Sequence, residues 1–120
     1  MPKVASQIPA ERLAQYERLV ATVPGLERKG ASVPYTSLNG NMSSFLTEAG
    51  VLALRLSAAD RQTFMDEYGT TLHEAHGTVM KEYVSVPSEI LADTDRLRPW
   101  FASSQAYVGS LKPKPTRRKR

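Results

Sequence analysis

Residues 32–56 read SVPYTSLNGNMSSFLTEAGVLALRL, and this stretch decides the fold. The Asn39-Gly40 pair near its centre indicates a hairpin, because both central residues of a type I′ turn need positive φ. It separates a predicted strand over 32–38 from a return strand over 41–46. A second turn leads to a third strand over 51–56, whose run of apolar residues is typical of a central strand. Three strands joined by tight turns predict an antiparallel meander.

Helical patterns flank these strands. Before them, apolar residues at helical spacing predict a helix over 9–23, which Pro24-Gly25 ends. After them, Ser57 is placed as the N-cap of a helix over 58–68, with an acidic residue at the third position as in a capping box. Gly69 ends this second helix, because glycine readily adopts the left-handed conformation of a C-cap.

The remaining segments complete the predicted fold. Residues 69–79 show no clear period and are expected to form a loop or an irregular edge segment. Residues 80–86 are rich in β-formers and predict a fourth strand. A short helical turn at 88–91 precedes a last helix over about 95–110, with Pro99 near its start, where a missing N–H costs little. The order α-β-β-β-α-β-α predicts an α+β fold with helices packed against an antiparallel sheet.

The charge is unevenly placed. The chain holds 16 Lys plus Arg and 12 Asp plus Glu, and residues 111–120, LKPKPTRRKR, hold six of the positive charges. The other 110 residues therefore hold 10 positive and 12 negative charges. We expect a disordered start over 1–8, one domain over 9–111 and a flexible basic tail over 112–120, whose two prolines oppose helix.

Composition excludes several classes of protein. The chain has 120 residues and no Cys. It is too short for a TIM barrel or a complete Rossmann dehydrogenase. Without cysteine it cannot hold a disulfide framework, an iron–sulfur cluster or a Cys-based zinc site. Its apolar runs are too short to span a bilayer, and residues 1–8 lack the apolar core of a secretory signal. We therefore expect a cytoplasmic protein without membrane contact.

Basic residues suggest contact with nucleic acid. A solvated basic arm attracts polyanions, so the tail and the Arg28-Lys29 pair before the first strand are candidates. The alternative is a solubilising terminus and an ordinary solvated loop. The candidate residues for nucleic-acid contact are Arg28, Lys29, Lys112, Lys114, Arg117, Arg118, Lys119 and Arg120.

The sequence His73-Glu74-Ala75-His76 is the one cluster with metal-ligating character. Two imidazoles and a carboxylate are ligands for zinc or nickel, and a histidine here could also act as a general base. The spacing differs from the zincin motif, which places two histidines four residues apart on a helix. The alternative is that His73, Glu74 and His76 are solvated or locally hydrogen-bonded loop residues.

Three further residues are candidates for a pocket: Tyr35, Arg55 and Tyr83. Aromatic residues at this spacing are also typical of a core. Arg55 faces opposite to its apolar neighbours in the third strand, where an ordinary cross-strand pair with a carboxylate such as Glu82 is the favoured interpretation.

Several groups of residues carry a family resemblance. They are Asn39-Gly40-Asn41-Met42, Leu54-Arg55-Leu56, Asp60-Arg61, Phe64, Tyr68-Gly69, Gly77-Thr78-Val79-Met80, Tyr83, Val86-Pro87, Leu91-Ala92-Asp93, Leu97 and Trp100. Over about residues 13–111 the chain resembles the amino-terminal domain of the TfoX/Sxy family of competence regulators. The family's usual Met-Phe-Gly-Gly segment is absent after Arg28-Lys29. The resemblance implies an α+β fold with an antiparallel sheet, a stand-alone version of this domain, and no catalytic residues to carry over.

We therefore expect a binding or regulatory module that acts through protein contacts, as a homodimer or with another protein. An open sheet edge pairs with a second copy or binds an extended partner. Such a module needs no cofactor and is not an enzyme. One alternative is a nucleic-acid-associated protein that uses the basic tail. The other is a metal-dependent enzyme centred on His73, Glu74 and His76.

Overall fold

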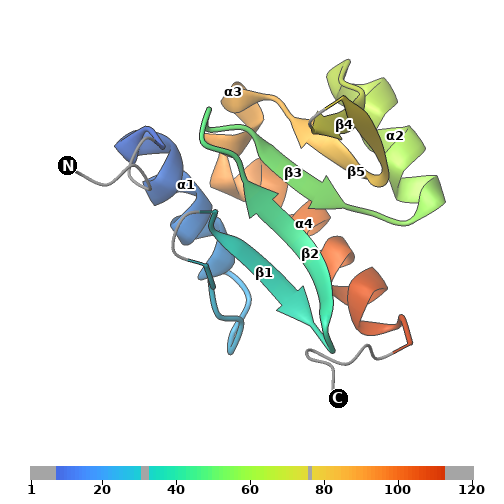
Figure 1. The fold of residues 1–120 in the computed structure, drawn as a ribbon, viewed down its shortest axis with the longest axis horizontal. Coiled ribbons are helices and arrows are strands. Elements are labelled where there is room, and N and C mark those ends of the chain that lie inside the picture. The colour runs from blue at the N-terminus through green and yellow to red at the C-terminus, as the bar shows by residue number, and fades with distance from the viewer. Residues whose placement is uncertain (1–7, 31–32, 76, 113–120) are drawn as a thin grey trace.

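An antiparallel sheet with helices on one of its faces forms the molecule (Figure 1). This computed structural model describes residues 8–30, 33–75 and 77–112. The elements are α1 (Ala10–Val20), β1 (Tyr35–Leu38), β2 (Asn41–Leu46), β3 (Leu52–Arg55), α2 (Ala58–Tyr68), β4 (Leu72–Ala75), β5 (Thr78–Val86), α3 (Ser88–Leu91) and α4 (Thr94–Gly109). The strand order is β1-β2-β3-β5-β4, so the predicted α+β class is confirmed.

The local signals in the sequence correspond to the turns and caps of the structure. Asn39 and Gly40 have φ of 53° and 81° and join β1 to β2 as the predicted hairpin. The Ser57 hydroxyl accepts a hydrogen bond from the backbone N–H of Asp60 and caps α2. Gly69 ends α2 in the left-handed conformation, with φ of 63°.

The sheet contains one strand more than the sequence predicts. Residues 72–75, expected as part of a loop or irregular edge segment, form the edge strand β4 and pair with β5. β5 begins at Thr78, two residues before the predicted start. The β4–β5 register shifts between Leu72 and His73, so β4 has only four residues and an interrupted alternation. A strand this short, with interrupted alternation, has no hydrophobic periodicity that the sequence could show. With β4 included, the order of helices and strands is α-β-β-β-α-β-β-α-α.

The ends of the predicted domain and helices differ in smaller ways. Ile8, assigned to the disordered start, is buried in the core. The rest of that start and the tail beyond Lys112 lie outside the described residues. α1 ends at Val20, three residues before the predicted end. Pro99 lies in the second turn of α4, not at its start. The carbonyl that Pro99 leaves without an N–H partner belongs to Asp95, which is exposed, so the helix continues.

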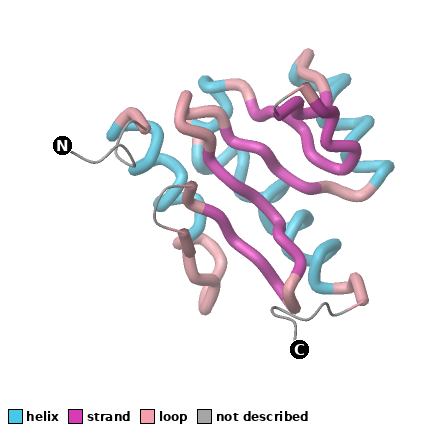
Figure 2. Tube along the Cα trace, viewed as in Figure 1, coloured by secondary structure: helices cyan, strands magenta, loops and turns pink. Residues whose placement is uncertain are grey.

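The core lies between the sheet and the helices, and Figure 2 shows α4 running behind the strands. An aromatic cluster joins α2 to α4: the Phe64 ring lies 4.7 Å from Tyr68 and 5.1 Å from Trp100. The Trp100 indole N–H donates to the Tyr68 hydroxyl over 3.2 Å. α2 therefore packs on the same side of the sheet as α4. Within the described ranges, the other face of the sheet has no helix over it, and no helix has the length and apolar character to cross a membrane.

Candidate binding groove on the uncovered sheet face

One row of side chains crosses the face of the sheet that the helices leave uncovered. Tyr35 pairs with Phe45, Phe45 with Ala53, and Ala53 with Ser85 across four strands. Neighbouring residues such as Leu46 and Leu54 point to the helices and are fully buried. Because side chains alternate along a strand, the row points away from the helices.

Phe45 forms the floor of this face. Ala53 and Ser85 are small, so the Phe45 side chain can lean across them from β2. Its ring lies 5.3 Å from the His73 ring in an edge-to-face arrangement and 5.7 Å from the Tyr83 ring. Ala53 is fully buried although it lies on the uncovered face, and His73 is only 5% exposed. One phenylalanine therefore covers the centre of the sheet in place of a helix.

A groove of about 850 Å³ lies over this floor, and its walls are largely apolar. It is lined by Val33, Tyr35, Met42, Phe45, Thr47, Glu48, Val51, His73, Glu74, Ala75 and Met80. Val33 is 43% exposed, a large fraction for a branched aliphatic side chain. A concave, mostly apolar surface of this size is typical of an interaction site.

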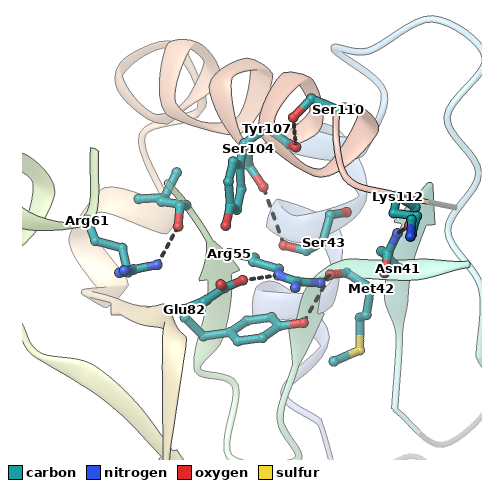
Figure 3. Close-up of polar contacts among 12 residues, drawn as sticks. Asn41, Met42, Ser43, Arg55, Arg61, Glu82, Ser104, Tyr107, Ser110 and Lys112 are labelled. Atoms are coloured by element: carbon teal, nitrogen blue, oxygen red, sulfur yellow. Dashed lines mark hydrogen bonds and ion pairs between the residues drawn. The ribbon is translucent and has the colours of Figure 1, made fainter. Parts of the chain in front are cut away.

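A polar cluster lies around Met42, one of the groove-lining residues (Figure 3). The backbone carbonyl of Met42 accepts hydrogen bonds from Arg55 Nη1 at 3.2 Å and from the Tyr83 hydroxyl at 3.0 Å. This carbonyl is available because the β1–β2 register shifts at Ser37, which pairs with Met42, and because the β2–β3 ladder starts only at Ser44. A bulge of this kind redirects backbone and side-chain groups.

Arg55 also forms an ion pair with Glu82. Arg55 Nε lies 2.8 Å from Glu82 Oε1, so the cross-strand pair favoured from the sequence is present. Residues 81–83 have no partner on β4, and this second bulge accompanies the approach of Glu82 to Arg55. Partial burial alone raises the pKa of the Glu82 carboxyl, but the hydrogen bond and charge of Arg55 outweigh it and lower the pKa overall.

The predicted pocket residues therefore occupy one region with different roles. Tyr35 lines the groove, while Arg55 and Tyr83 are outside its lining and both donate to the backbone carbonyl of Met42, which lines it. The sequence reasoning missed Phe45 as the floor, although strand alternation already places it opposite Leu46. It also missed Met80 and Val33 as parts of one surface, because their proximity depends on the register of distant strands.

Two members of the predicted metal cluster, His73 and Glu74, lie on β4. His73 Nδ1 lies 2.9 Å from the Ser85 hydroxyl, and the ring packs beneath Phe45. Glu74 is exposed, and His76 lies outside the described residues. Within the part of the chain that the structure describes, no three metal-ligating side chains gather at one point.

Three of the residues predicted to contact nucleic acid lie in the described part of the chain, and the other five do not. Arg28 is engaged by Glu17 at 2.8 Å and donates to the Gly30 carbonyl. Lys29 Nζ donates to Ser37 on β1 over 3.0 Å. The Lys112 carbonyl accepts from Asn41 at the start of β2, so Lys29 and Lys112 approach the same hairpin, β1–β2. Residues Lys114, Arg117, Arg118, Lys119 and Arg120 lie outside the described residues.

No family model, curated protein or solved structure matches this chain. The groove offers apolar contacts along its length and a hydrogen-bonded cation–carboxylate pair beside Met42. The groove is therefore suited to bind apolar side chains, and the nearby Arg55–Glu82 pair is suited to orient the bound segment.

His73 is expected to make folding sensitive to mild acid. Burial lowers the pKa of this histidine below its ordinary 6.5. The unfolded chain therefore takes up the proton first, and stability is lost as pH falls from about 6.5 towards the folded-state pKa. Glu82, whose ordinary pKa is 4.5, acts in a lower range.

Urea denaturation at several pH values between 7.5 and 5.5 measures this effect. His73→Gln retains a hydrogen-bonding group but cannot titrate, and we expect it to flatten the fall in unfolding free energy. His76→Gln replaces the other histidine of the chain, and retention of the fall in this variant assigns the effect to His73. An equal slope in wild type and His73→Gln would contradict the assignment.

Proposed function

We propose that this chain is a protein-binding module that recognises its partner through the groove on the uncovered face of the sheet. The observation that carries the proposal is the apolar groove of about 850 Å³ floored by Phe45. Transfer of exposed apolar surface from water into an interface is the main favourable term in protein association. The exposed side chain of Val33 on the groove wall supports this use.

A regulatory role suits such a module. The resemblance to the TfoX/Sxy amino-terminal domain implies an α+β fold, and the antiparallel sheet agrees with that expectation. We infer that regulation proceeds by protein contact at the groove, with a second copy of the chain as one candidate partner. The polar cluster at Arg55 and Glu82 would fix the orientation of the bound segment, because charged groups at an interface set its register.

Two matched variants test the groove. Val33→Glu places a charge on the groove wall, whereas Val79→Glu places the same charge on a valine of similar exposure, 46%, outside the groove lining. Because a buried, unpaired carboxylate opposes association, we expect Val33→Glu to reduce partner capture at least about tenfold. Val79→Glu should bind as wild type does.

The measurement compares proteins captured from cell extract by the immobilised wild-type chain and by each variant. Sedimentation velocity on the same samples shows whether the lost partner is a second copy. Equal capture and equal sedimentation of wild type, Val33→Glu and Val79→Glu would rule out the groove as the contact surface.

Contact with nucleic acid is the second candidate function. The observation that favours it is the placement of Lys29 and Lys112 beside the same β1–β2 hairpin, where the basic segment 113–120 follows in the sequence. The Lys29 ammonium and the backbone of Lys112 thereby lie beside the same hairpin, although they come from distant parts of the chain. Lysine and arginine side chains gathered near one another attract the phosphate backbone of a nucleic acid.

The salt dependence of duplex binding tests this function. An arm that neutralises about five phosphates gives a log–log slope of about −4 to −5 against salt concentration. Deleting 113–120 leaves the Asn41–Lys112 hydrogen bond in place and should remove most of that slope. If wild type binds no duplex, or the truncated chain binds with the same slope, the tail has no such role.

A further inference from the structure

A chain of buried hydroxyl groups runs from α1 through the sheet to α4. The Tyr16 hydroxyl lies 2.7 Å from Ser44 Oγ, and Ser44 Oγ lies 2.6 Å from Thr36 Oγ1. Thr36 lies 2.6 Å from Ser43 Oγ, which donates to the Gln105 amide oxygen over 3.0 Å. All five residues are buried, so these groups depend on one another for hydrogen bonds.

Counting protons gives this hydroxyl chain a direction. Each hydroxyl has one proton to donate. If the donors run from Tyr16 to Gln105, each of the four protons has an acceptor. In the opposite direction, the Tyr16 proton has no acceptor among the described residues, because Ser44 is the one hydrogen-bond partner that they provide. The favourable direction places the amide oxygen of Gln105 against Ser43 and leaves the amide nitrogen on the other side.

That amide nitrogen is buried and has no hydrogen-bond partner among the described residues. Gln105 itself is only 7% exposed. Buried amide groups almost always find a partner, so an unpaired donor marks a place where an acceptor is missing. The nitrogen belongs to a residue that lines a cavity, and this makes the cavity a candidate ligand site.

The cavity has a volume of about 300 Å³ and lies between the α1–β1 connection, β1 and α4. Val23, Leu26 and Leu38 supply apolar walls. Glu27 and Lys29 also line it, are both exposed, and bring opposite charges. None of these residues lines the groove on the other face of the sheet. A volume at the lower end of the range for ligand pockets suits a body of a few heavy atoms.

We propose that this cavity binds a small molecule that carries a carbonyl-type oxygen, as a carboxylate or carboxamide, on a short branched aliphatic body. The oxygen accepts a hydrogen bond from Gln105 Nε2, and the aliphatic body contacts Val23, Leu26 and Leu38. Because the opposite charges of Glu27 and Lys29 cancel, the cavity does not select a ligand by its net charge. It selects a ligand by the oxygen acceptor that carboxylates and carboxamides have in common. The site is independent of the proposed protein-binding groove.

Entry to the site requires a small movement of the wall. The amide nitrogen is shielded from solvent, so the side chains that cover it must shift outward before a ligand oxygen makes contact. The wall that contains Val23 and Leu26 belongs to a connection of turns with no helix or strand. Such a segment adapts at lower cost than a strand of the sheet. The hydrogen bond formed there is protected from competing water.

Isobutyramide and isobutyrate are the two probes, titrated into the ¹⁵N-labelled full chain and followed by NMR. We expect the side-chain amide signals of Gln105 to shift, together with backbone signals of Leu26 and Leu38. A response to the amide alone, to the carboxylate alone or to both supports the site and identifies its preferred ligand. The absence of a saturable shift of the Gln105 amide with either probe would overturn the proposal.

Three variants localise the binding. Gln105→Met removes the donor and should weaken binding about tenfold or more, as expected for loss of a shielded hydrogen bond. Gln15→Met, a buried glutamine on α1 outside the cavity, is the matched control and should bind as wild type does. Leu26→Trp fills the cavity with the amide intact and should abolish binding. Undiminished binding to folded Gln105→Met or to folded Leu26→Trp would place the ligand elsewhere.

Discussion

Replacing Phe64 by Ala is expected to lower the free energy of unfolding by about 3–5 kcal/mol. Phe64 is fully buried and is the central ring of the aromatic cluster with Tyr68 and Trp100. Its removal leaves a cavity between α2, α4 and the sheet. Two edge-to-face contacts are lost together with the buried area, and such pairs add stability beyond their burial.

Urea denaturation followed by circular dichroism measures this loss. Gln62→Ala, an exposed position on the same helix, is the control and should change stability by less than about 0.5 kcal/mol. A loss below about 1 kcal/mol for Phe64→Ala would show that α2 is not held to α4 by this cluster. The cluster would then no longer support the inference that α2 packs on the same side of the sheet as α4 and leaves the other face uncovered.

Local sequence signals predict most of the elements of this fold. The Asn39-Gly40 turn, the Ser57 cap and the Gly69 stop each depend on the conformation of a few adjacent residues, and each is present in the structure. β4 could not be predicted in this way, because its four residues form a strand through pairing with β5, and that pairing includes a register shift. An edge strand with a broken period is determined by its partner, not by its own pattern.

The candidate site depends on longer-range information. Of the three predicted pocket residues, Tyr35 lines the groove, whereas Arg55 and Tyr83 lie outside its lining and meet each other at a point that the sequence did not reveal. The junction is the Met42 carbonyl, which the bulge in β2 makes available. Phe45 reaches His73 only because the register places Ala53 and Ser85 between them. Registers and bulges follow from the packing of the whole sheet.

The hydroxyl chain leads to the second large effect, a loss of about 1–3 kcal/mol for Ser44→Ala. Without Ser44, the buried Tyr16 hydroxyl has a proton and no acceptor among the described residues. Burial already raises the pKa of Tyr16 to about 12, with partial offset from its hydrogen bond to Ser44 and from the nearby Thr36 hydroxyl, so the phenol stays protonated and must donate. The cost of an unmet buried donor exceeds the value of the hydrogen bond itself.

Tyr16→Phe should have a much smaller effect, because Ser44, Thr36 and Ser43 each keep an acceptor for their proton. It should also recover most of the loss in Ser44→Ala, since the double variant has no phenol proton to satisfy. Unfolding free energies of the four proteins form a double-mutant cycle that measures this coupling. A loss in the double variant as large as the loss in Ser44→Ala would contradict this account, because the phenol proton would then not be the unmet donor.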